Sequence, residues 1–117
     1  MLTAKETKER IKNAPEKWIA ALMDFVDDFR LHKDSSAIYE SFNIDHERLD
    51  AVLASSIETL CDELKIDIPE WLYEIPSCKH SYFVVGDDDL MATAIVESPI
   101  RFRLRKVFVM ENFLSRV

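Results

Sequence analysis

Residues 46 to 64 read HERLDAVLASSIETLCDEL, and this stretch carries the strongest helical pattern in the chain. Its apolar side chains recur every three or four positions over about five turns, the spacing that gives an α-helix one apolar face. Asp45 stands where an N-cap residue is expected, and Ile44 is placed to pack on Leu49 as a hydrophobic staple. The pattern predicts a central helix whose apolar face organises a core formed by Leu49, Val52, Leu53, Ile57, Leu60 and Leu64.

Three further helices are expected on the N-terminal side of this element. Residues 1 to 14 predict a peripheral, polar N-terminal helix that ends before Pro15, because proline is tolerated only in the first turn of a helix. Residues 15 to 32 predict a second helix, and a short third helix carries Ile38, Tyr39 and Phe42, capped from the Asp34-Ser35-Ser36 stretch. The second helix has its own apolar stripe of Trp18, Leu22, Phe25, Val26 and Phe29.

The chain after the central helix gives weaker signals. Pro69 followed by Trp71 predicts one or two helical turns. Residues 81 to 85 are rich in β-formers, but five residues make no stable sheet without a partner strand, so we expect an extended or irregular segment. Residues 87 to 89 are three aspartates that suit the positive end of a helix, and we expect a short, largely buried helix over 90 to 96.

The C-terminal stretch carries two conflicting patterns. Ser98 as N-cap and Pro99 at the first helical position favour a helix, whereas residues 100 to 105 alternate apolar and basic side chains as a half-buried strand does. Residues 107 to 109 favour an extended stretch, and residues 111 to 116 a terminal helix. The whole chain of 117 residues predicts a mostly α, single-domain helical bundle over 1 to 117 with an irregular or short extended C-terminal segment.

Charge is distributed unevenly along the chain. The overall net charge is −7, but residues 13 to 100 hold six Lys or Arg against nineteen Asp or Glu, while both ends are basic. An acidic body repels nucleic acid and attracts basic protein surfaces. No apolar run approaches the roughly 20 residues that span a bilayer, and the first residues lead into charge instead of a signal core, so we expect a cytoplasmic protein.

Few residues suggest chemistry, and we expect no catalytic residue, no metal and no cofactor. Cys61 and Cys78 lack metal-type spacing and are expected to be reduced thiols. The three histidines lie outside any zinc motif, and the single glycine rules out most phosphate-binding loops. Asp24, Asp27 and Asp28 are close enough on one helix to share a cation, but a solvated helix face is the favoured interpretation.

Arg101, Arg103, Arg105 and Lys106 form a basic cluster interleaved with phenylalanines. Such a cluster can grip phosphate and stack on bases. It can equally pair with carboxylates of the same chain or of a protein partner. Because the body of the chain is so acidic, we favour carboxylate pairing over nucleic acid.

The residues from Leu90 to Arg116 resemble the C-terminal signature of small bacterial antitoxin-like proteins. Here Glu97-Ser98-Pro99 opens an ESPxxFRxRxxFV core, which leads into an ENFLSR tail at Glu111. Upstream, RLDAVLA at 48 to 54 and the proline–tryptophan step at 69 to 71 are also similar to that family. Lys106 departs from the pattern, where many relatives have asparagine.

The resemblance implies a role in a toxin–antitoxin system. Members of this family accompany nucleotidyltransferase-like toxins, so the implied function is neutralisation of a cognate toxin by direct protein binding, without catalysis. The alternative is a DNA-binding transcriptional regulator that uses the arginine cluster, and a homodimer stays open. The residues expected to contact the partner are Arg101, Phe102, Arg103, Arg105, Phe108, Glu111, Asn112 and Phe113.

Overall fold

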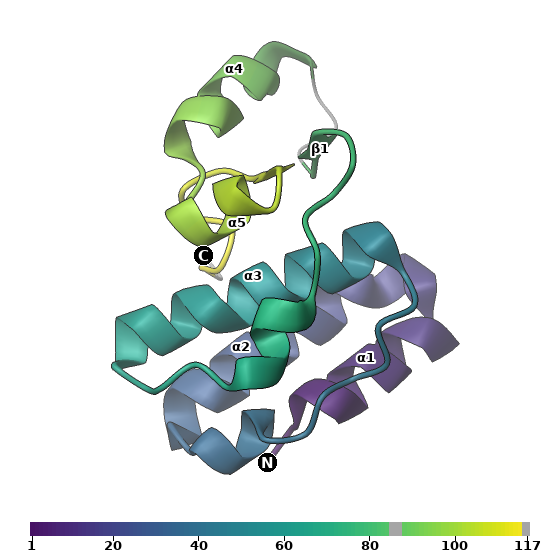
Figure 1. The fold of residues 1–117 in the computed structure, drawn as a ribbon, viewed down its shortest axis with the longest axis vertical. Coiled ribbons are helices and arrows are strands. Elements are labelled where there is room, and N and C mark those ends of the chain that lie inside the picture. Colours follow the sequence, from purple (N-terminus) through teal and green to yellow (C-terminus); the bar gives the residue numbers. More distant parts are fainter. Residues whose placement is uncertain (85–87, 116–117) are drawn as a thin grey trace.

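The computed structural model describes residues 1–84 and 88–115, and it is mostly helical, as predicted. Three long helices form the body: α1 (Ala4–Asn13), α2 (Trp18–His32) and α3 (Glu47–Leu64). Figure 1 shows them side by side, with the C-terminal elements stacked above α3. Their facing sides form one hydrophobic core, to which Phe25, Phe29, Leu53, Ile57 and Leu60 contribute. The periodicity of residues 46 to 64 therefore located the central helix correctly.

The start of α3 differs from the prediction in its capping residue. His46 is the N-cap, and its Nδ1 accepts a hydrogen bond from the backbone N–H of Leu49 at 3.2 Å. Asp45 is drawn away because its carboxylate binds the ammonium groups of Lys8 and Lys12. Ile44, the expected staple residue, is exposed. Competition from two lysines of α1 thus overrides the local capping preference.

The N-terminal helix is not peripheral, which corrects the sequence prediction. Its Ala4, Thr7, Lys8 and Ile11 are buried against α2 and the rest of the body. The buried Lys8 Nζ donates to the carboxylate of Asp50 on α3, to Asp45 at 2.8 Å and to the carbonyl of Asn43. A polar sequence therefore docks through a lysine, because three acceptors compensate the desolvation of its charge.

Short 3₁₀ helices connect the longer elements: η1 (Pro15–Lys17), η2 (Ser35–Ile38) and η3 (Glu70–Glu74). The carboxylate of Asp34 caps η2 by accepting from the N–H of Ser36, as expected. Trp71 on η3 donates from its indole nitrogen to the carbonyl of Ile38 at 2.9 Å, and its ring meets Phe42 edge to face. These contacts hold the proline–tryptophan step against η2.

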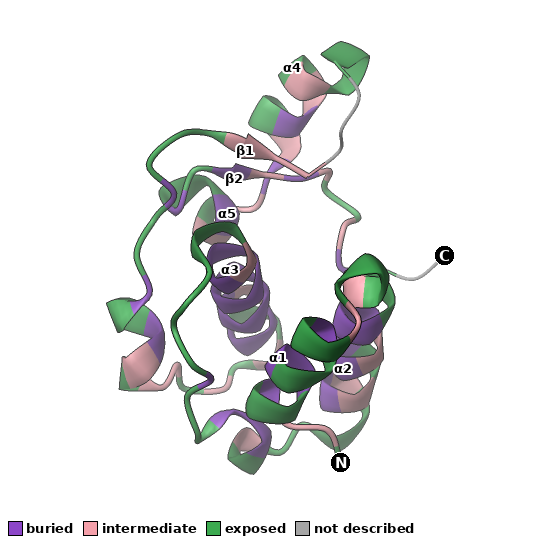
Figure 2. Ribbon diagram, turned by 90° about the vertical axis from the view of Figure 1, so that its right-hand side faces the viewer, coloured by how far each residue is buried: buried purple, intermediate pink, exposed green. Residues whose placement is uncertain are grey.

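The C-terminal elements form a small unit on top of α3. It comprises β1 (Tyr82–Phe83), α4 (Asp88–Glu97), α5 (Ile100–Leu104) and β2 (Val107–Phe108). The two strands pair in parallel, with Tyr82 opposite Val107 and Phe83 opposite Phe108. Figure 2 shows this two-stranded sheet between α4 and the helical body. Residues 82 and 83, which are β-prone, thus pair with a second strand, as so short a segment requires. Val85, Gly86 and Asp87 lie outside the described residues.

The conflict over residues 98 to 109 is resolved by a helix followed by a strand. Pro99, not Ser98, occupies the N-cap position of α5, and its carbonyl accepts from the N–H groups of Phe102 and Arg103. Lys106 has a φ of 59°, a left-handed conformation that turns the chain from α5 into β2. Lys33 and Lys65 end α2 and α3 in the same way.

The expected terminal helix over 111 to 116 does not form among the described residues. Hydrogen bonds from the N–H of Phe113 to Met110 and from that of Ser115 to Asn112 make successive turns instead. Arg116 lies outside the described part of the chain. No helix in the described residues is both long enough and apolar enough to cross a bilayer.

Candidate partner-binding surface

Ser98 joins α4 to β2 from a buried position. Its hydroxyl has the carbonyls of Ala94 and Val109 within reach of its single hydrogen and accepts from the N–H of Val109 at 2.8 Å. The serine of the ESP motif therefore acts as a hydrogen-bonding junction instead of the expected helix cap. It fixes where α4 ends and where the chain returns after β2.

Arg105 is buried and binds three groups of the same chain. Its guanidinium donates to the carboxylate of Glu58 on α3, to the carbonyl of Leu72 at 2.8 Å and to that of Ile75 at 3.2 Å. The side chain therefore ties the C-terminal unit to α3 and to the end of η3. Because it is covered, Arg105 cannot be one of the partner contacts expected from the sequence.

Arg101 lies at the edge of the same unit and is partly exposed. It forms a two-pronged ion pair with Asp62 of α3, with distances of 2.9 and 3.0 Å. The hydrogen bonds that Arg101 donates to the carboxylate of Asp62 raise the pKa of Arg101 above its already high usual value. Carboxylate pairing within the chain, favoured from the sequence, thus occupies two of the four clustered cations.

Arg103 and Lys106 are the exposed members of the basic cluster. A nucleic-acid site of the kind envisaged needs several cations that can reach phosphates together. With Arg105 buried and Arg101 held by Asp62, the cluster presents a much smaller positive surface than its sequence suggested. The geometry therefore gives no specific support to DNA binding.

The phenylalanines of the motif pack mainly on other aromatic rings of the chain. Phe102 is fully buried and meets the ring of Phe113 edge to face, with 5.8 Å between the ring centroids. Phe108 stacks on Phe83, with 4.9 Å between the ring centroids. Phe102 is therefore a core residue and not the surface contact expected. Phe108 and Phe113 are half-buried and keep only part of their rings exposed.

Glu111 and Asn112 are exposed near the end of α4, as a contact role requires. The N–H of Glu111 donates to the carboxylate of Glu97 at 3.1 Å. Of the residues predicted to contact a partner, the structure leaves Arg103, Glu111 and Asn112 exposed, and it leaves Arg101, Phe108 and Phe113 partly exposed. Phe102 and Arg105 are buried.

The helix α4 is the feature that sequence reasoning missed. We expected it to be largely buried, but Ala94 is its only buried residue. Ile95 is 48% exposed and Val96 is 77% exposed, and the neighbouring Ile100 of α5 is 55% exposed. An apolar run suggests burial, but burial also needs a covering element, and the sequence does not indicate whether one is present. Exposed aliphatic side chains therefore lie on both α4 and α5.

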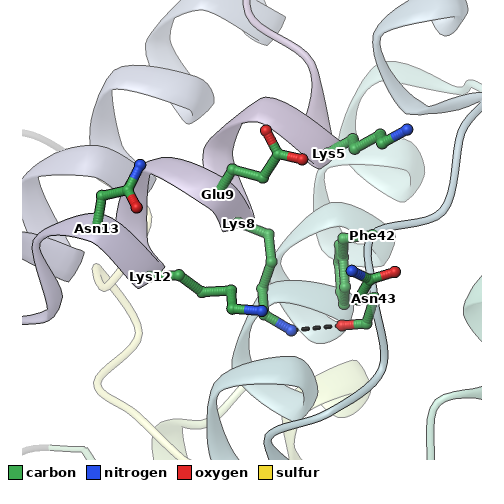
Figure 3. Close-up of a pocket in the computed structure, with 7 residues that line it drawn as sticks. All are labelled: Lys5, Lys8, Glu9, Lys12, Asn13, Phe42 and Asn43. Carbon is green, nitrogen blue, oxygen red and sulfur yellow. Dashed lines mark hydrogen bonds between the residues drawn. The ribbon is translucent and has the colours of Figure 1, made fainter.

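A hollow lies along α1, away from the C-terminal elements. Figure 3 shows Lys5, Lys8 and Lys12 following one face of that helix, with Phe42 and Asn43 opposite. The ammonium of Lys8 lies 5.0 Å from the centroid of Phe42. Lys5 and Lys12 pair with Glu40 and Asp45. The lysines of this hollow are thus bound to the chain's own acceptors, and we assign it a structural role.

The two cysteines and the aspartates of α2, considered above as candidate sites, are buried or contact other groups of the chain. Both cysteines are buried; burial raises the pKa of the Cys61 thiol to about 11 and also raises that of Cys78. Asp24 pairs with Arg10, and Asp28 accepts from the N–H of Leu2. Within residues 1–84 and 88–115, no group of three or more His, Cys, Asp or Glu side chains is arranged to hold a metal ion.

Comparison with protein-family models, curated proteins and solved structures finds no match to this chain. The surface must therefore be interpreted from its own residues.

Proposed function

We propose that this chain is an antitoxin-like protein that neutralises a nucleotidyltransferase-like toxin by direct protein binding in the cytoplasm. The observation that carries the proposal is the exposure of Ile95 and Val96, directly before the ESPxxFRxRxxFV motif, and of Ile100 within it. Exposed apolar patches mark protein contact sites more often than sites for nucleic acid, which require positive charge. The resemblance of the motif to antitoxin-like proteins supplies the class of partner.

The acidic character of the chain supports the same role. A nucleotidyltransferase must bind phosphate groups, and a cleft that does so is positively charged. An acidic protein is attracted to such a cleft, and this attraction raises the rate of association. The chain need only cover the cleft, so it requires no catalytic residue of its own.

The motif contributes the scaffold of the binding surface, not most of its contacts. Arg105, Phe102 and Ser98 hold α4 and α5 in place from the interior. The apolar anchors of the contact are the exposed side chains of α4 and α5, because Phe108 and Phe113, also expected to contact the partner, are half-buried. Arg103, Glu111 and Asn112 can add polar contacts at the border.

Where a neighbouring reading frame encodes a nucleotidyltransferase-like protein, the test is co-expression of that protein with this chain. We expect that protein alone to arrest growth, co-expression of this chain to restore growth, and the two proteins to co-purify in 0.3–0.5 M salt, roughly where exposed charge pairs are screened. Growth arrest that persists despite soluble expression of this chain would refute the antitoxin role. Retention of promoter DNA by the free chain, lost as salt rises, would favour the regulator instead.

A further inference from the structure

A pocket of about 280 Å³ lies where the end of α1 and the start of α3 approach β1. Its apolar lining comes from Ile11 of α1 and from Leu49 and Val52 of α3, and the aromatic rings of Trp18 and Tyr82 complete it. Sites for small molecules combine such a lining with a few polar groups that fix the orientation of the ligand. The pocket is close to the lower size limit of such sites, roughly 300 Å³, so it suits a small molecule.

A cation faces this pocket without a counter-charge. The guanidinium of Arg48 lies 4.9 Å from the ring centroid of Tyr82, and this cation–π contact holds it at the pocket. Within residues 1–84 and 88–115, the guanidinium forms no ion pair and no hydrogen bond. The neighbouring carboxylate of Glu47 accepts instead from the backbone N–H of Lys79. The N–H groups of Arg48 are therefore free to bind a ligand.

The other nitrogen-bearing side chains of the lining are donors as well. Nδ1 of His46 accepts from the N–H of Leu49, so the ring hydrogen of the neutral imidazole is on Nε2. The indole N–H of Trp18 can only donate, and it has no hydrogen-bond partner in the described part of the chain. None of the described residues that line the pocket is Asp, Glu, Asn or Gln. This set of groups favours a ligand with an apolar ring and an acceptor.

The single guanidinium indicates how much charge that acceptor carries. A carboxylate matches one guanidinium through two parallel N–H···O hydrogen bonds. A phosphate ester carries more negative charge, and a chain with a net charge of −7 repels it more strongly than it repels one carboxylate. The pocket therefore suits one carboxylate better than a phosphate.

We propose that this pocket binds a small planar aromatic carboxylate. The ring of the ligand packs on Trp18 and Leu49, and its carboxylate accepts hydrogen bonds from Arg48. Tyr82 is a positioning residue, because its ring holds the guanidinium at the pocket. The site lies outside the exposed aliphatic surface of α4 and α5, so this inference goes beyond the proposed function and does not depend on it.

The probe is 2-naphthoate, with the uncharged 2-naphthamide as its control, and NMR follows the two indole N–H signals of the full chain. Trp71 is the internal reference, because its indole N–H donates to the carbonyl of Ile38 away from the pocket. We expect 2-naphthoate to shift the Trp18 signal saturably, with a Kd below about 1 mM, and to leave the Trp71 signal in place. 2-Naphthamide should bind at least about tenfold more weakly, because it lacks the charge-assisted hydrogen bonds.

The carboxylate contact is tested with a matched pair of variants. Arg48→Gln removes the cation at an exposed position and should leave the fold intact. We expect it to raise the Kd of 2-naphthoate at least about tenfold and to change that of 2-naphthamide little. Arg103→Gln, at an exposed position of α5 outside the pocket, is the control and should change the Kd less than about twofold. Equal Kd values for the two variants would overturn the contact with Arg48.

Three further outcomes would also overturn the proposal. The first is the absence of a saturable Trp18 shift up to about 10 mM 2-naphthoate. The second is displacement of 2-naphthoate by an equal concentration of inorganic phosphate, which would favour a phosphate ligand. The third is a Trp18 signal that moves when the free chain is diluted, because it would indicate that a second copy occupies the pocket. None of these results bears on toxin binding, which is tested separately by co-expression.

Discussion

Arg105 donates a hydrogen bond from its guanidinium to the carboxylate of Glu58, and the two side chains are buried although they lie 47 residues apart in sequence. The pair links α5 to α3, and the carbonyls of Leu72 and Ile75 accept the remaining bonds of the guanidinium. It is one of the contacts that hold the motif-bearing unit on the helical body, together with the ion pair of Arg101 and Asp62.

Loss of the buried pair should therefore be costly. We expect Glu58→Gln to lower the free energy of unfolding by about 3–5 kcal/mol, because Arg105 would remain buried without its counter-charge. Asp62→Asn is the matched control, since it removes the more exposed partner of Arg101 and should cost at most about 1 kcal/mol. Urea denaturation followed by circular dichroism measures both. Equal losses would show that Arg105 does not depend on Glu58.

Lys8 of α1 is also a buried cation, and we expect its loss to be similarly destabilising. Lys8→Met should destabilise the protein by about 3–5 kcal/mol, because the buried carboxylate of Asp50 loses its counter-charge. Lys5→Met, which removes an exposed partner of Glu40, should cost less than about 1 kcal/mol. Hydrogen exchange should show α1 opening first in the Lys8 variant. Unchanged protection of α1 would contradict its docking through Lys8.

The Asp45 carboxylate should make stability depend on pH in the acid range. Hydrogen bonds from Lys12 and Lys8 lower the pKa of Asp45 from 3.8 to about 2. Since the folded-state pKa lies below the unfolded one, the stabilisation is complete above about pH 4 and is lost as the pH falls towards 2. Carboxyl NMR shifts should report the depressed pKa directly. In an Asp45→Asn variant the stability should fall less over this window, and an ordinary pKa for Asp45 would refute the contact.

Lys106 offers a stabilising substitution. Its φ of 59° is unfavourable for most L-amino acids, whereas asparagine tolerates the left-handed region. We expect Lys106→Asn to raise the free energy of unfolding by roughly 0.5 kcal/mol, as judged from the urea midpoint. Arg103→Asn, at an exposed position within α5, is the control and should be neutral or destabilising. A lower midpoint for Lys106→Asn would contradict the assigned turn.

The buried thiols predict a chemical test of the fold. Burial raises the pKa of Cys61 to about 11, so at pH 8 little thiolate is present and the side chain is covered. We expect both cysteines to react slowly with a thiol reagent in native protein and rapidly in urea. One thiol that reacts at once in buffer would show that its segment opens.

The helical elements of the body follow from local patterns in the sequence. The i, i+3 and i+4 spacing between 46 and 64, and the stripe between 18 and 29, are local patterns that a helix alone satisfies. Pro69 and Trp71 likewise located η3, because proline constrains its own backbone whatever surrounds it. The uneven distribution of charge and the lack of metal-type cysteine spacing also follow directly from the sequence.

Which side chains are covered depends on how the elements pack in three dimensions. Burial of Lys8 and Arg105, pairing of Tyr82 with Val107 and exposure of Ile95 and Val96 all depend on segments distant in sequence. Whether an apolar helix is core or surface depends on whether another element lies against it, and no pattern within ten residues contains that information. The candidate binding surface could therefore be placed near the C-terminal motif from the sequence, but its contacts were assigned to α4 only in three dimensions.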